Sequence, residues 1–298
     1  MRRYAAMFAR LAERGEGAFG AFVMLGDPDL ATSARLLDSL VEGGADMVEV
    51  GIPFSDPVAD GPVIQAAAER ALGAGTRVDD CFALLAGFRR RHERVPVGVL
   101  TYANLLCARG RELFCRDLAG AGADSLLVAD VPSIEAGPYS AAAREAGLDL
   151  VMVAAPNTGA GALERIAALS SGYTYCVARP GVTGVSEAMA LDHQALFGAI
   201  ERLGAPPPVL GFGISTPEQV AEAIAAGAAG AISGSAIVRL AAAGGDPGPR
   251  VAAFIRSMKE ATRGRSASPA GAPLAGANRP CHYGPSGGPN GRSQPGRL

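Results

Sequence analysis

The sequence predicts an α/β fold in which strands and helices alternate and close into a (β/α)8 barrel of the TIM type. Short apolar runs alternate with longer amphipathic segments between residues 21 and 235, which is typical of parallel βαβ units. Glycine follows several of the amphipathic segments, at the position where it ends a helix. The apolar runs number eight, and eight such units favour a closed barrel over an open sheet.

Each element can be placed along the chain. An additional N-terminal helix is expected over residues 3–14. The eight strands are expected, in order, at Ala21–Leu25, Asp46–Val50, Val97–Leu100, Ser125–Ala129, Leu150–Val153, Tyr173–Ala178, Pro208–Phe212 and Ala229–Ser233. Amphipathic periodicity predicts helices that include Leu30–Glu42, Arg111–Ala121, Ile134–Ala146, Ala162–Leu169, Ala195–Leu203, Pro217–Ala226 and a last helix at Pro249–Thr262.

The composition of the chain changes near its C-terminal end. Residues 264–298 are rich in glycine and proline and contain no acidic residue. Such a segment buries too little apolar surface to offset its chain entropy, so we expect it to be disordered. The chain has 298 residues, enough for one large core. We therefore expect one catalytic barrel domain over residues 1–263, followed by a disordered tail over residues 264–298.

Composition also narrows the class of protein. The formal net charge is −2, which does not suggest a nucleic-acid-binding surface. No apolar run approaches the ~20 residues that cross a bilayer, and no signal peptide follows the N-terminus. The five cysteines are scattered without a CxxC motif, which favours free thiols in a reducing compartment. We expect a cytoplasmic enzyme that binds neither nucleic acid nor membrane.

Acidic residues cluster after the second predicted strand. Glu49 ends this strand, and the following loop carries Asp56 and Asp60. Strand alternation places Glu49 on the face opposite Val48 and Val50, toward the barrel interior, where burial should raise its pKa. Asp60 lies on a loop and should be better solvated. Two acids in different surroundings, at the strand ends where barrels carry their active sites, favour acid–base chemistry.

Structural roles are the alternatives for these acids. Glu49 could form a salt bridge with a barrel arginine, and Asp60 could be a turn residue before Gly61. Asp56 is expected to be a turn or interface residue. Asp130 follows the fourth strand, and we favour a structural hydrogen bond there over a third catalytic acid.

Small residues after the last strands predict a phosphate site. A glycine-rich turn containing Gly213 follows the seventh strand, and Gly234-Ser235 follows the eighth and opens a helix. Backbone N–H groups and the helix dipole at such positions bind anions. Gly184, after the sixth strand, could close this site. The alternative is that these glycines only form tight turns. We expect a small phosphorylated substrate.

Missing residue types restrict the reaction. A Schiff-base aldolase needs a lysine inside the barrel, but the only lysine, Lys259, lies beyond the eighth strand. A metal aldolase needs clustered histidine or carboxylate ligands, but none of His92, His193 and His282 follows a strand. These absences favour metal-free acid–base catalysis by Glu49 and Asp60.

The segment from Glu49 to Gln65, EVGIPFSDPVADGPVIQ, closely resembles the signature of the tryptophan synthase α subunit family. Further matches follow in order over residues 3–258, and they are Leu25–Pro28, Tyr102–Asn104, Val128–Pro132, Gly181–Gly184, Gly211–Ser215 and Gly230–Ala236. The resemblance implies retro-aldol cleavage of indole-3-glycerol phosphate to indole and glyceraldehyde 3-phosphate.

The same resemblance implies roles for individual residues. Glu49 would be the general acid–base, and Asp60 would accept a hydrogen bond from the indole N–H. Thr183 would help to close the site and position Asp60. The implied substrate-binding residues are Phe22, Ile64, Leu100, Leu127, Tyr175, Thr183, Gly184, Phe212, Gly213, Ile232, Gly234 and Ser235.

The family further implies a partner. Its β subunit would take up the indole for tryptophan synthesis in an α2β2 heterotetramer, with contacts around Pro53, Asp56 and Asn104. Pyridoxal phosphate is expected only on that β subunit, and no cofactor or metal is expected on this chain.

Three features depart from the family pattern. Pro180 lies in the loop after the sixth strand, Met24 replaces a smaller, more polar residue, and the tail is not usual. A stand-alone lyase that releases free indole is therefore an alternative. A catalytically idle barrel that scaffolds or activates a β-type partner is another, which the intact pair of Glu49 and Asp60 disfavours.

Overall fold

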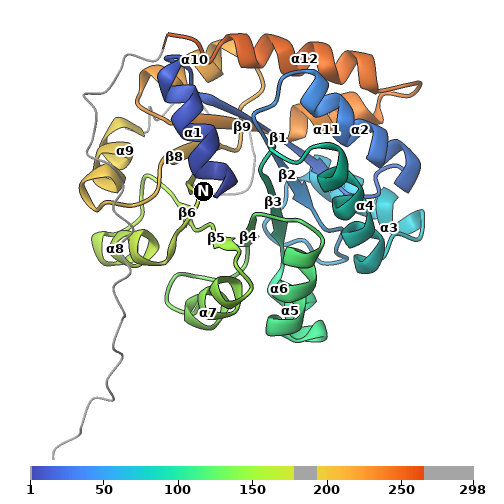
Figure 1. Ribbon diagram of the computed structural model, residues 1–298, viewed down its shortest axis with the longest axis horizontal. Helices are drawn as coiled ribbons and strands as arrows, with labels where there is room; N and C mark the ends of the chain where they lie inside the picture. Colours follow the sequence, from blue (N-terminus) through green and yellow to red (C-terminus); the bar gives the residue numbers. More distant parts are fainter. Residues whose placement is uncertain (1, 178–192, 265–298) are drawn as a thin grey trace, which may run out of the picture. The chain divides into compact units, whose positions relative to one another are not determined.

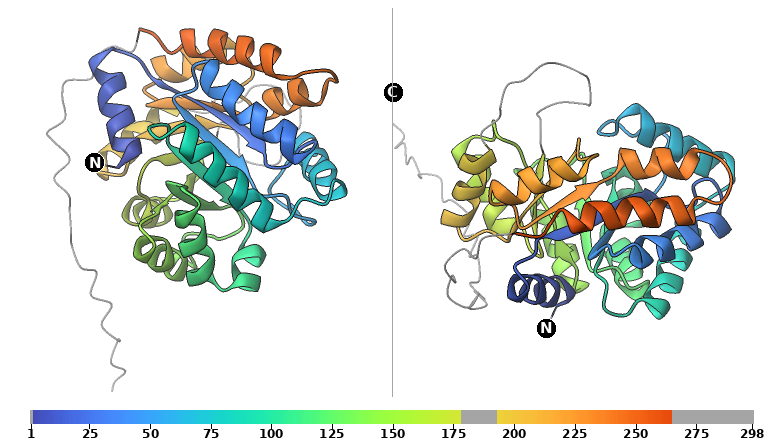
Figure 2. Two further views of the ribbon diagram at one scale, coloured as in Figure 1. Left: turned by 45° about the vertical axis from the view of Figure 1, so that its right-hand side comes forward. Right: turned by 90° about the horizontal axis from the view of Figure 1, so that it is seen from above.

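The computed structural model of the chain describes residues 2–177 and 193–264. In these two ranges parallel strands form one curled sheet, and helices lie around its outside (Figure 1, with two further views in Figure 2). The predicted barrel-like α/β fold is confirmed. The predicted tail lies outside the described residues beyond Gly264, and so do Pro180, Thr183 and Gly184.

The sheet contains a strand at every predicted position. The strands are β1 (Ala18–Met24), β2 (Met47–Gly51), β3 (Val97–Thr101), β4 (Ser125–Val128), β5 (Asp149–Leu150), β6 (Val153–Ala154), β7 (Thr174–Val177), β8 (Pro208–Gly211) and β9 (Gly230–Ser233). Their order in the sheet is β5-β4-β3-β2-β1-β9-β8-β7-β6, so β5 and β6 form its two ends.

The fifth predicted strand differs from the expectation, because it is divided into β5 and β6. β5 pairs with β4, and β6 pairs with β7. Between them, the Val151 N–H donates to the Leu126 carbonyl at 2.9 Å, and the Met152 carbonyl accepts from the Tyr175 N–H at 3.0 Å. The segment thus changes its pairing partner within a few residues, and the two ends of the sheet meet there.

The helices agree with the predicted positions to within a few residues. They are α1 (Arg3–Glu13), α2 (Leu30–Glu42), α6 (Arg111–Gly120), α7 (Gly137–Glu145), α8 (Ala160–Leu169), α9 (His193–Arg202), α10 (Pro217–Ala225) and α12 (Gly248–Glu260). Further helices are α3 (Pro62–Gly73), α4 (Val78–Arg91), α5 (Ala103–Arg109) and α11 (Ser235–Ala242). In residues 2–177 and 193–264, no helix is long and apolar enough to span a bilayer.

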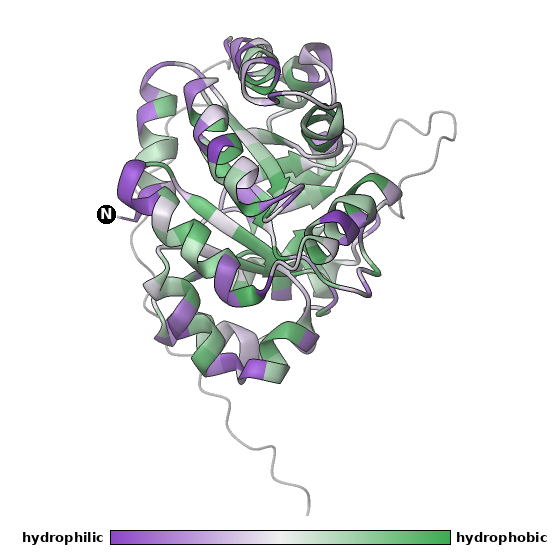
Figure 3. Cartoon of the chain, turned by 90° about the vertical axis from the view of Figure 1, so that its right-hand side faces the viewer, coloured by the Kyte–Doolittle hydropathy of each residue, from purple (hydrophilic) through white to green (hydrophobic). Residues whose placement is uncertain are grey.

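Strand alternation separates two apolar clusters. Val48 and Val50 of β2 belong to the cluster between the strands and the helices, whereas Met47 belongs to a second cluster inside the barrel. Figure 3 shows the apolar strands at the centre and hydrophilic stretches on the surrounding helices. Glu49 shares the inward face with Met47, as the alternating pattern predicts.

Helix α1 covers the end of the barrel at which the strands begin. Its buried side chains Tyr4, Met7 and Leu11 belong to the interior cluster. This helix lies outside the βαβ repeat. Its contacts keep water away from the end of the interior where the strands begin.

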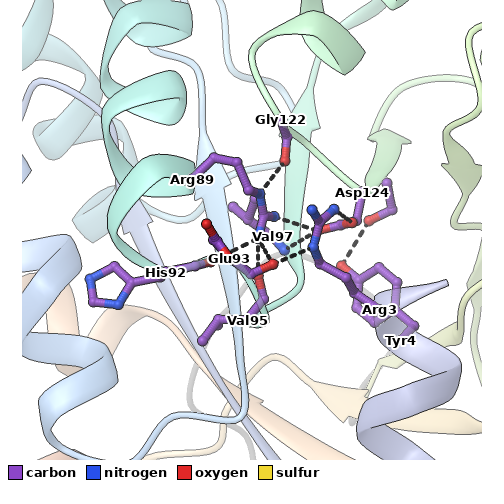
Figure 4. Close-up of polar contacts among 10 residues, drawn as sticks. Arg3, Tyr4, Arg89, His92, Glu93, Val95, Val97, Gly122 and Asp124 are labelled. Atoms are coloured by element: carbon purple, nitrogen blue, oxygen red, sulfur yellow. Dashed lines mark hydrogen bonds and ion pairs between the residues drawn. The ribbon is translucent and has the colours of Figure 1, made fainter. Parts of the chain in front are cut away.

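An arginine inside a ring of acceptors fixes this end of the barrel (Figure 4). Arg89 of α4 donates to the Asp124 carboxylate at 2.7 Å, to the Gly122 carbonyl at 2.9 Å, and to three carbonyls of the α4–β3 connection. Asp124 also accepts from Arg3 of α1 and from the Val97 N–H, both at 2.8 Å. The network therefore joins α1, α4, β3 and the residue before β4.

Candidate active site

A cavity of about 330 Å³ opens at the end of the barrel where the strands finish. Its walls come from strands β1, β2, β3, β7 and β9, from the loops after β2, β8 and β9, and from the first turns of α3 and α11. The lining residues are Phe22, Glu49, Asp60, Gly61, Pro62, Val63, Ile64, Leu100, Tyr175, Phe212, Gly213, Ile214, Ser215, Ile232, Gly234, Ser235, Ala236 and Arg239. The structure thus brings together the two predicted catalytic acids and Gly213, Gly234 and Ser235 of the predicted phosphate site.

Glu49 is buried in the barrel interior, with 2% of its surface exposed. The Tyr173 hydroxyl donates a hydrogen bond to its Oε1 at 2.9 Å. Burial raises the pKa of Glu49 to about 7, while this hydrogen bond opposes the rise and the negative charge of Asp60 adds to it. In the described part of the chain, no arginine or lysine forms an ion pair with Glu49, so the alternative salt bridge is not found.

Tyr4 and Ser125 support Tyr173 on the side where the strands begin. The centroids of the Tyr4 and Tyr173 rings are 5.3 Å apart, and the Tyr4 hydroxyl oxygen is 2.9 Å from the Ser125 hydroxyl oxygen. Gly98, which is paired with Glu49 across β2 and β3, leaves space for these side chains. A Cβ atom on Gly98 would lie 2.6 Å from Ser125 Oγ and 2.9 Å from Tyr4 Oη. Helix α1 and Gly98 therefore help to position Tyr173, the hydrogen-bond donor to Glu49.

Asp60 is more buried than we expected for a loop residue, since only 6% of its surface is exposed. The Tyr102 hydroxyl donates to its Oδ2 at 2.9 Å and accepts from the Ala59 N–H at 3.2 Å. Burial raises the pKa of Asp60 above its ordinary value, and the hydrogen bond from Tyr102 opposes the rise. We expected Asp60 to be better solvated than Glu49, but the exposed fractions, 6% and 2%, differ little, and the Tyr102 hydroxyl lies against the Asp60 carboxyl group.

The other two loop acids lie outside the cavity lining. Asp56 is exposed and accepts a hydrogen bond from Ser55 Oγ at 2.5 Å. Asp130 accepts from the Ala103 N–H at the start of α5, at 2.8 Å. The structural hydrogen bond that we favoured for Asp130 is therefore confirmed.

Most predicted substrate-binding residues meet at the cavity. Leu127 is the exception within the described ranges, because it is buried in the interior cluster but does not line the cavity. Thr183 and Gly184 lie outside the described residues. The predicted residues that line the cavity are Phe22, Ile64, Leu100, Tyr175, Phe212, Gly213, Ile232, Gly234 and Ser235.

The turn after β8 has an unusual backbone. Phe212 has a φ of +60° and Gly213 a φ of +86°, a left-handed region that a bulky residue rarely adopts. The Phe212 and Tyr175 rings pack edge to face, with their centroids 5.6 Å apart. Gly211 permits this arrangement, because a Cβ atom there would lie 2.0 Å from Tyr175 Oη. The turn thus fixes one aromatic wall of the cavity.

The anion-binding features adjoin aromatic lining residues, since Gly213 follows Phe212 and a Cβ atom on Gly234 would lie 3.4 Å from Phe22. Gly234 is the N-cap of α11, and Ser235 is its first residue. The first N–H groups of a helix have no acceptor within the helix, and the helix dipole favours negative charge there. With Gly213 and Ser215 on the same cavity, these residues could hold a phosphate group.

Lys259 lies away from the cavity. Its ammonium group pairs with Glu16 at 3.0 Å and with Asp46 at 2.8 Å. Asp46 directly precedes β2, at the end where the strands begin. Lys259 is therefore not available to the cavity, in agreement with the sequence analysis.

Tyr102, Tyr173 and Arg239 were not predicted as functional residues. Tyr173 stands two residues before Tyr175, which was predicted to bind substrate, so strand alternation could have shown that both face the interior. Tyr102 directly follows the third strand. Arg239 follows Ser235 by one helical turn, and this spacing could have placed it near the cavity.

Comparison with known proteins identifies similar chains. Residues 8–263 match the family described as "Tryptophan synthase alpha chain". The alpha chain from Shewanella amazonensis is 48% identical over 88% of this chain and 99% of that protein. The alpha chain from Aeromonas hydrophila is 52% identical over 80% of this chain and 90% of that protein. A crystal structure of tryptophan synthase from M. tuberculosis, in its aminoacrylate-bound form, has a TM-score of 0.78 and 30% identity over 88% of this chain and 100% of that chain.

Replacing Tyr173 with phenylalanine should raise the pKa of Glu49 above its value of about 7, because the lost hydrogen bond stabilises the ionised carboxylate. The pKa would be measured by a pH titration of the carboxyl 13C signal, assigned by its loss in Glu49→Gln. Tyr175→Phe, two residues further along the chain, is the control and should leave the pKa unchanged. An unchanged or lowered pKa in Tyr173→Phe would contradict the assigned hydrogen bond.

Proposed function

Because this chain belongs to the tryptophan synthase alpha chain family, we propose that Glu49 and Asp60 perform the family's reaction in the cavity described above. The chain is an indole-3-glycerol phosphate lyase, which breaks one carbon–carbon bond to give indole and glyceraldehyde 3-phosphate. The observation that carries the assignment of residues is the buried carboxyl of Glu49, with a pKa of about 7, facing a cavity that also holds Asp60.

Glu49 acts first as an acid. Its protonated carboxyl group gives a proton to C3 of the indole ring, and the ring becomes a cationic indolenine. A group with a pKa near the working pH is suited to this transfer, because both its forms are populated. Burial in the barrel interior gives Glu49 that property, whereas an exposed glutamate would be almost entirely ionised at neutral pH.

Glu49 then acts as a base. The ionised carboxylate takes the proton of the hydroxyl group on the side-chain carbon that is bonded to C3. The oxygen of that hydroxyl forms the aldehyde C=O bond, the carbon–carbon bond breaks, and its electron pair returns to the ring as indole forms. Glu49 is protonated again at the end, so the cycle needs no other proton donor.

Asp60 stabilises the charge that develops between these two steps. Its carboxylate would accept a hydrogen bond from the indole N–H, where the indolenine cation carries positive charge. Fixed charge in a cavity shielded from water stabilises such an intermediate strongly. The hydrogen bond from Tyr102, at 2.9 Å, holds the carboxylate in place and favours its ionised form.

The two ends of the substrate match the two walls of the cavity. We assign the indole ring to the apolar wall, where Leu127 would support the lining residues from behind. We assign the phosphate to the adjoining small residues, with Gly184 closing the site and Thr183 positioning Asp60. The apolar wall consists of Phe22, Ile64, Leu100, Tyr175, Phe212 and Ile232, and the phosphate wall of Gly213, Gly234 and Ser235.

A tryptophan synthase β subunit is the proposed partner, in an α2β2 heterotetramer in which only the β subunit carries pyridoxal phosphate. Exposed residues on the strand-end face support it. Val58 is 71% exposed and Ile134 is 72% exposed, and Asp56 and Asn104 are also exposed. Pro53 is buried, so these exposed residues would make the contact.

Hydrogen bonds connect the three loops of that face. The Ala59 N–H donates to Tyr102, and the Ala103 N–H donates to Asp130. The centroids of the Phe54 and Tyr102 rings are also 5.4 Å apart. Because Tyr102 is the partner of Asp60, a β subunit bound on this face would act on Asp60 through one side chain.

A reducing compartment, the cytoplasm, is the proposed location. Cys81, Cys107, Cys115 and Cys176 are free thiols, and disulfides are rare in reducing compartments.

Glu49→Gln should lower kcat for cleavage of indole-3-glycerol phosphate by roughly 10³-fold or more, because one residue performs both proton transfers. Release of indole by the purified full chain measures the loss. Glu69→Gln, which alters an exposed glutamate of α3, is the matched control and should retain full activity. Cleavage by Glu49→Gln at a rate near that of the unaltered chain would refute the assigned role.

Adding a β subunit should raise the turnover of the isolated chain by roughly 5- to 150-fold, the usual range for coupled sites. Val58→Asp should weaken this activation without changing the basal rate. Leu203→Asp is the control, because Leu203 is 41% exposed and follows α9, at the end where strands begin. Fast turnover without a partner would instead indicate the stand-alone lyase. Binding of a β subunit with no cleavage would indicate the idle scaffold.

A further inference from the structure

Arg239 is the only basic side chain among the described residues that line the cavity. It belongs to α11 and follows Ser235, the first residue of that helix, by four positions. Residues four apart lie on the same face of a helix, and both Ser235 and Arg239 line the cavity. Arg239 therefore belongs to the wall that begins at the phosphate-binding end of α11.

Arg239 has no acidic partner in residues 2–177 and 193–264. Its side chain is exposed, and neither an ion pair nor a hydrogen bond engages it there. The neighbouring Arg70 is different, because it forms two hydrogen bonds, at 2.7 and 2.8 Å, with the buried carboxylate of Asp27. Arg70 is thus neutralised by a fixed partner, whereas the positive charge of Arg239 is available to a ligand.

The position of Arg239 is at the border between the cavity and the outer surface. Arg239, Pro62 and Val63 line the cavity and also line an open groove of about 300 Å³ between α3 and α11. Arg70 and Val238 lie in that groove. Arg239 thus lies where the groove meets the cavity.

A cation near the phosphate would improve the charge balance of the site. A phosphate monoester carries about −1.5 to −2 charges at pH 7, and it must enter a cavity that already contains Glu49 and Asp60. The helix dipole provides only about half a positive charge. An ionised Asp60 would repel the phosphate, and a further positive group near the phosphate would offset that repulsion.

We propose that Arg239 attracts the phosphate group of the substrate and holds it by its charge as the phosphate binds at Gly234 and Ser235. This inference rests on the proposed function, since it assumes a phosphorylated substrate in this cavity. Arg239 takes no part in proton transfer. Its charge therefore acts equally on the bound substrate and on the transition state, which changes KM and leaves kcat nearly constant.

Steady-state cleavage of indole-3-glycerol phosphate by the full chain tests this role. Arg239→Gln should raise KM by roughly three- to tenfold at about 0.01 M ionic strength, with kcat changed less than about twofold. The difference should disappear at about 1 M salt, because the Debye length falls from about 30 to about 3 Å. Arg239→Lys keeps the charge and should retain a KM close to that of the unaltered chain, with its salt dependence.

Arg256→Gln is the matched control, because it removes one exposed positive charge from α12 without altering the cavity lining. It should leave KM unchanged at both salt concentrations. If Arg239→Gln behaves like Arg256→Gln, or if its defect is equally large at high salt, the inference about Arg239 is overturned while the lyase function stands. If the unaltered chain does not cleave the substrate, alone or with a β subunit, the proposed function fails and the inference fails with it.

Discussion

The burial of the Glu49 carboxyl group inside the barrel is the constraint on which most of the site depends. An ionised carboxylate without a partner is costly to bury. The hydrogen bond from Tyr173, at 2.9 Å, offsets only part of that cost, and the pKa settles at about 7. A stronger partner such as an arginine would keep the group ionised, and full exposure to water would do the same. Glu49 exchanges a proton near neutral pH because its environment lies between these two extremes.

The support for Glu49 extends to the opposite end of the barrel. Tyr173 packs against Tyr4 of α1, and Tyr4 is hydrogen-bonded to Ser125. Gly98 leaves the space in which these hydroxyl groups meet. The Asp124 and Arg89 network then fixes α1 over the ends of the strands. A helix that contributes no lining residue to the cavity is thus connected to the acid–base group through two aromatic rings.

Local patterns in the sequence predicted the barrel and the inward direction of Glu49, because a strand period of two residues determines which face a side chain occupies. They could not show the division of the fifth strand, which depends on its pairing with β4 on one side and β7 on the other. They also missed the cover over Asp60, since Tyr102 lies 42 positions away in the sequence. Tyr173 is 124 positions from Glu49, and no local pattern reports such a contact.

The pH dependence of kcat/KM for indole-3-glycerol phosphate tests the central claim most directly, because this parameter reports the protonation states of the free enzyme. Glu49 must begin the cycle protonated, so kcat/KM should fall as pH rises through the pKa of Glu49, at about 7. The apparent pKa of this fall should equal the value from the carboxyl 13C titration of Glu49. A kcat/KM that stays constant or increases as Glu49 loses its proton would contradict the account.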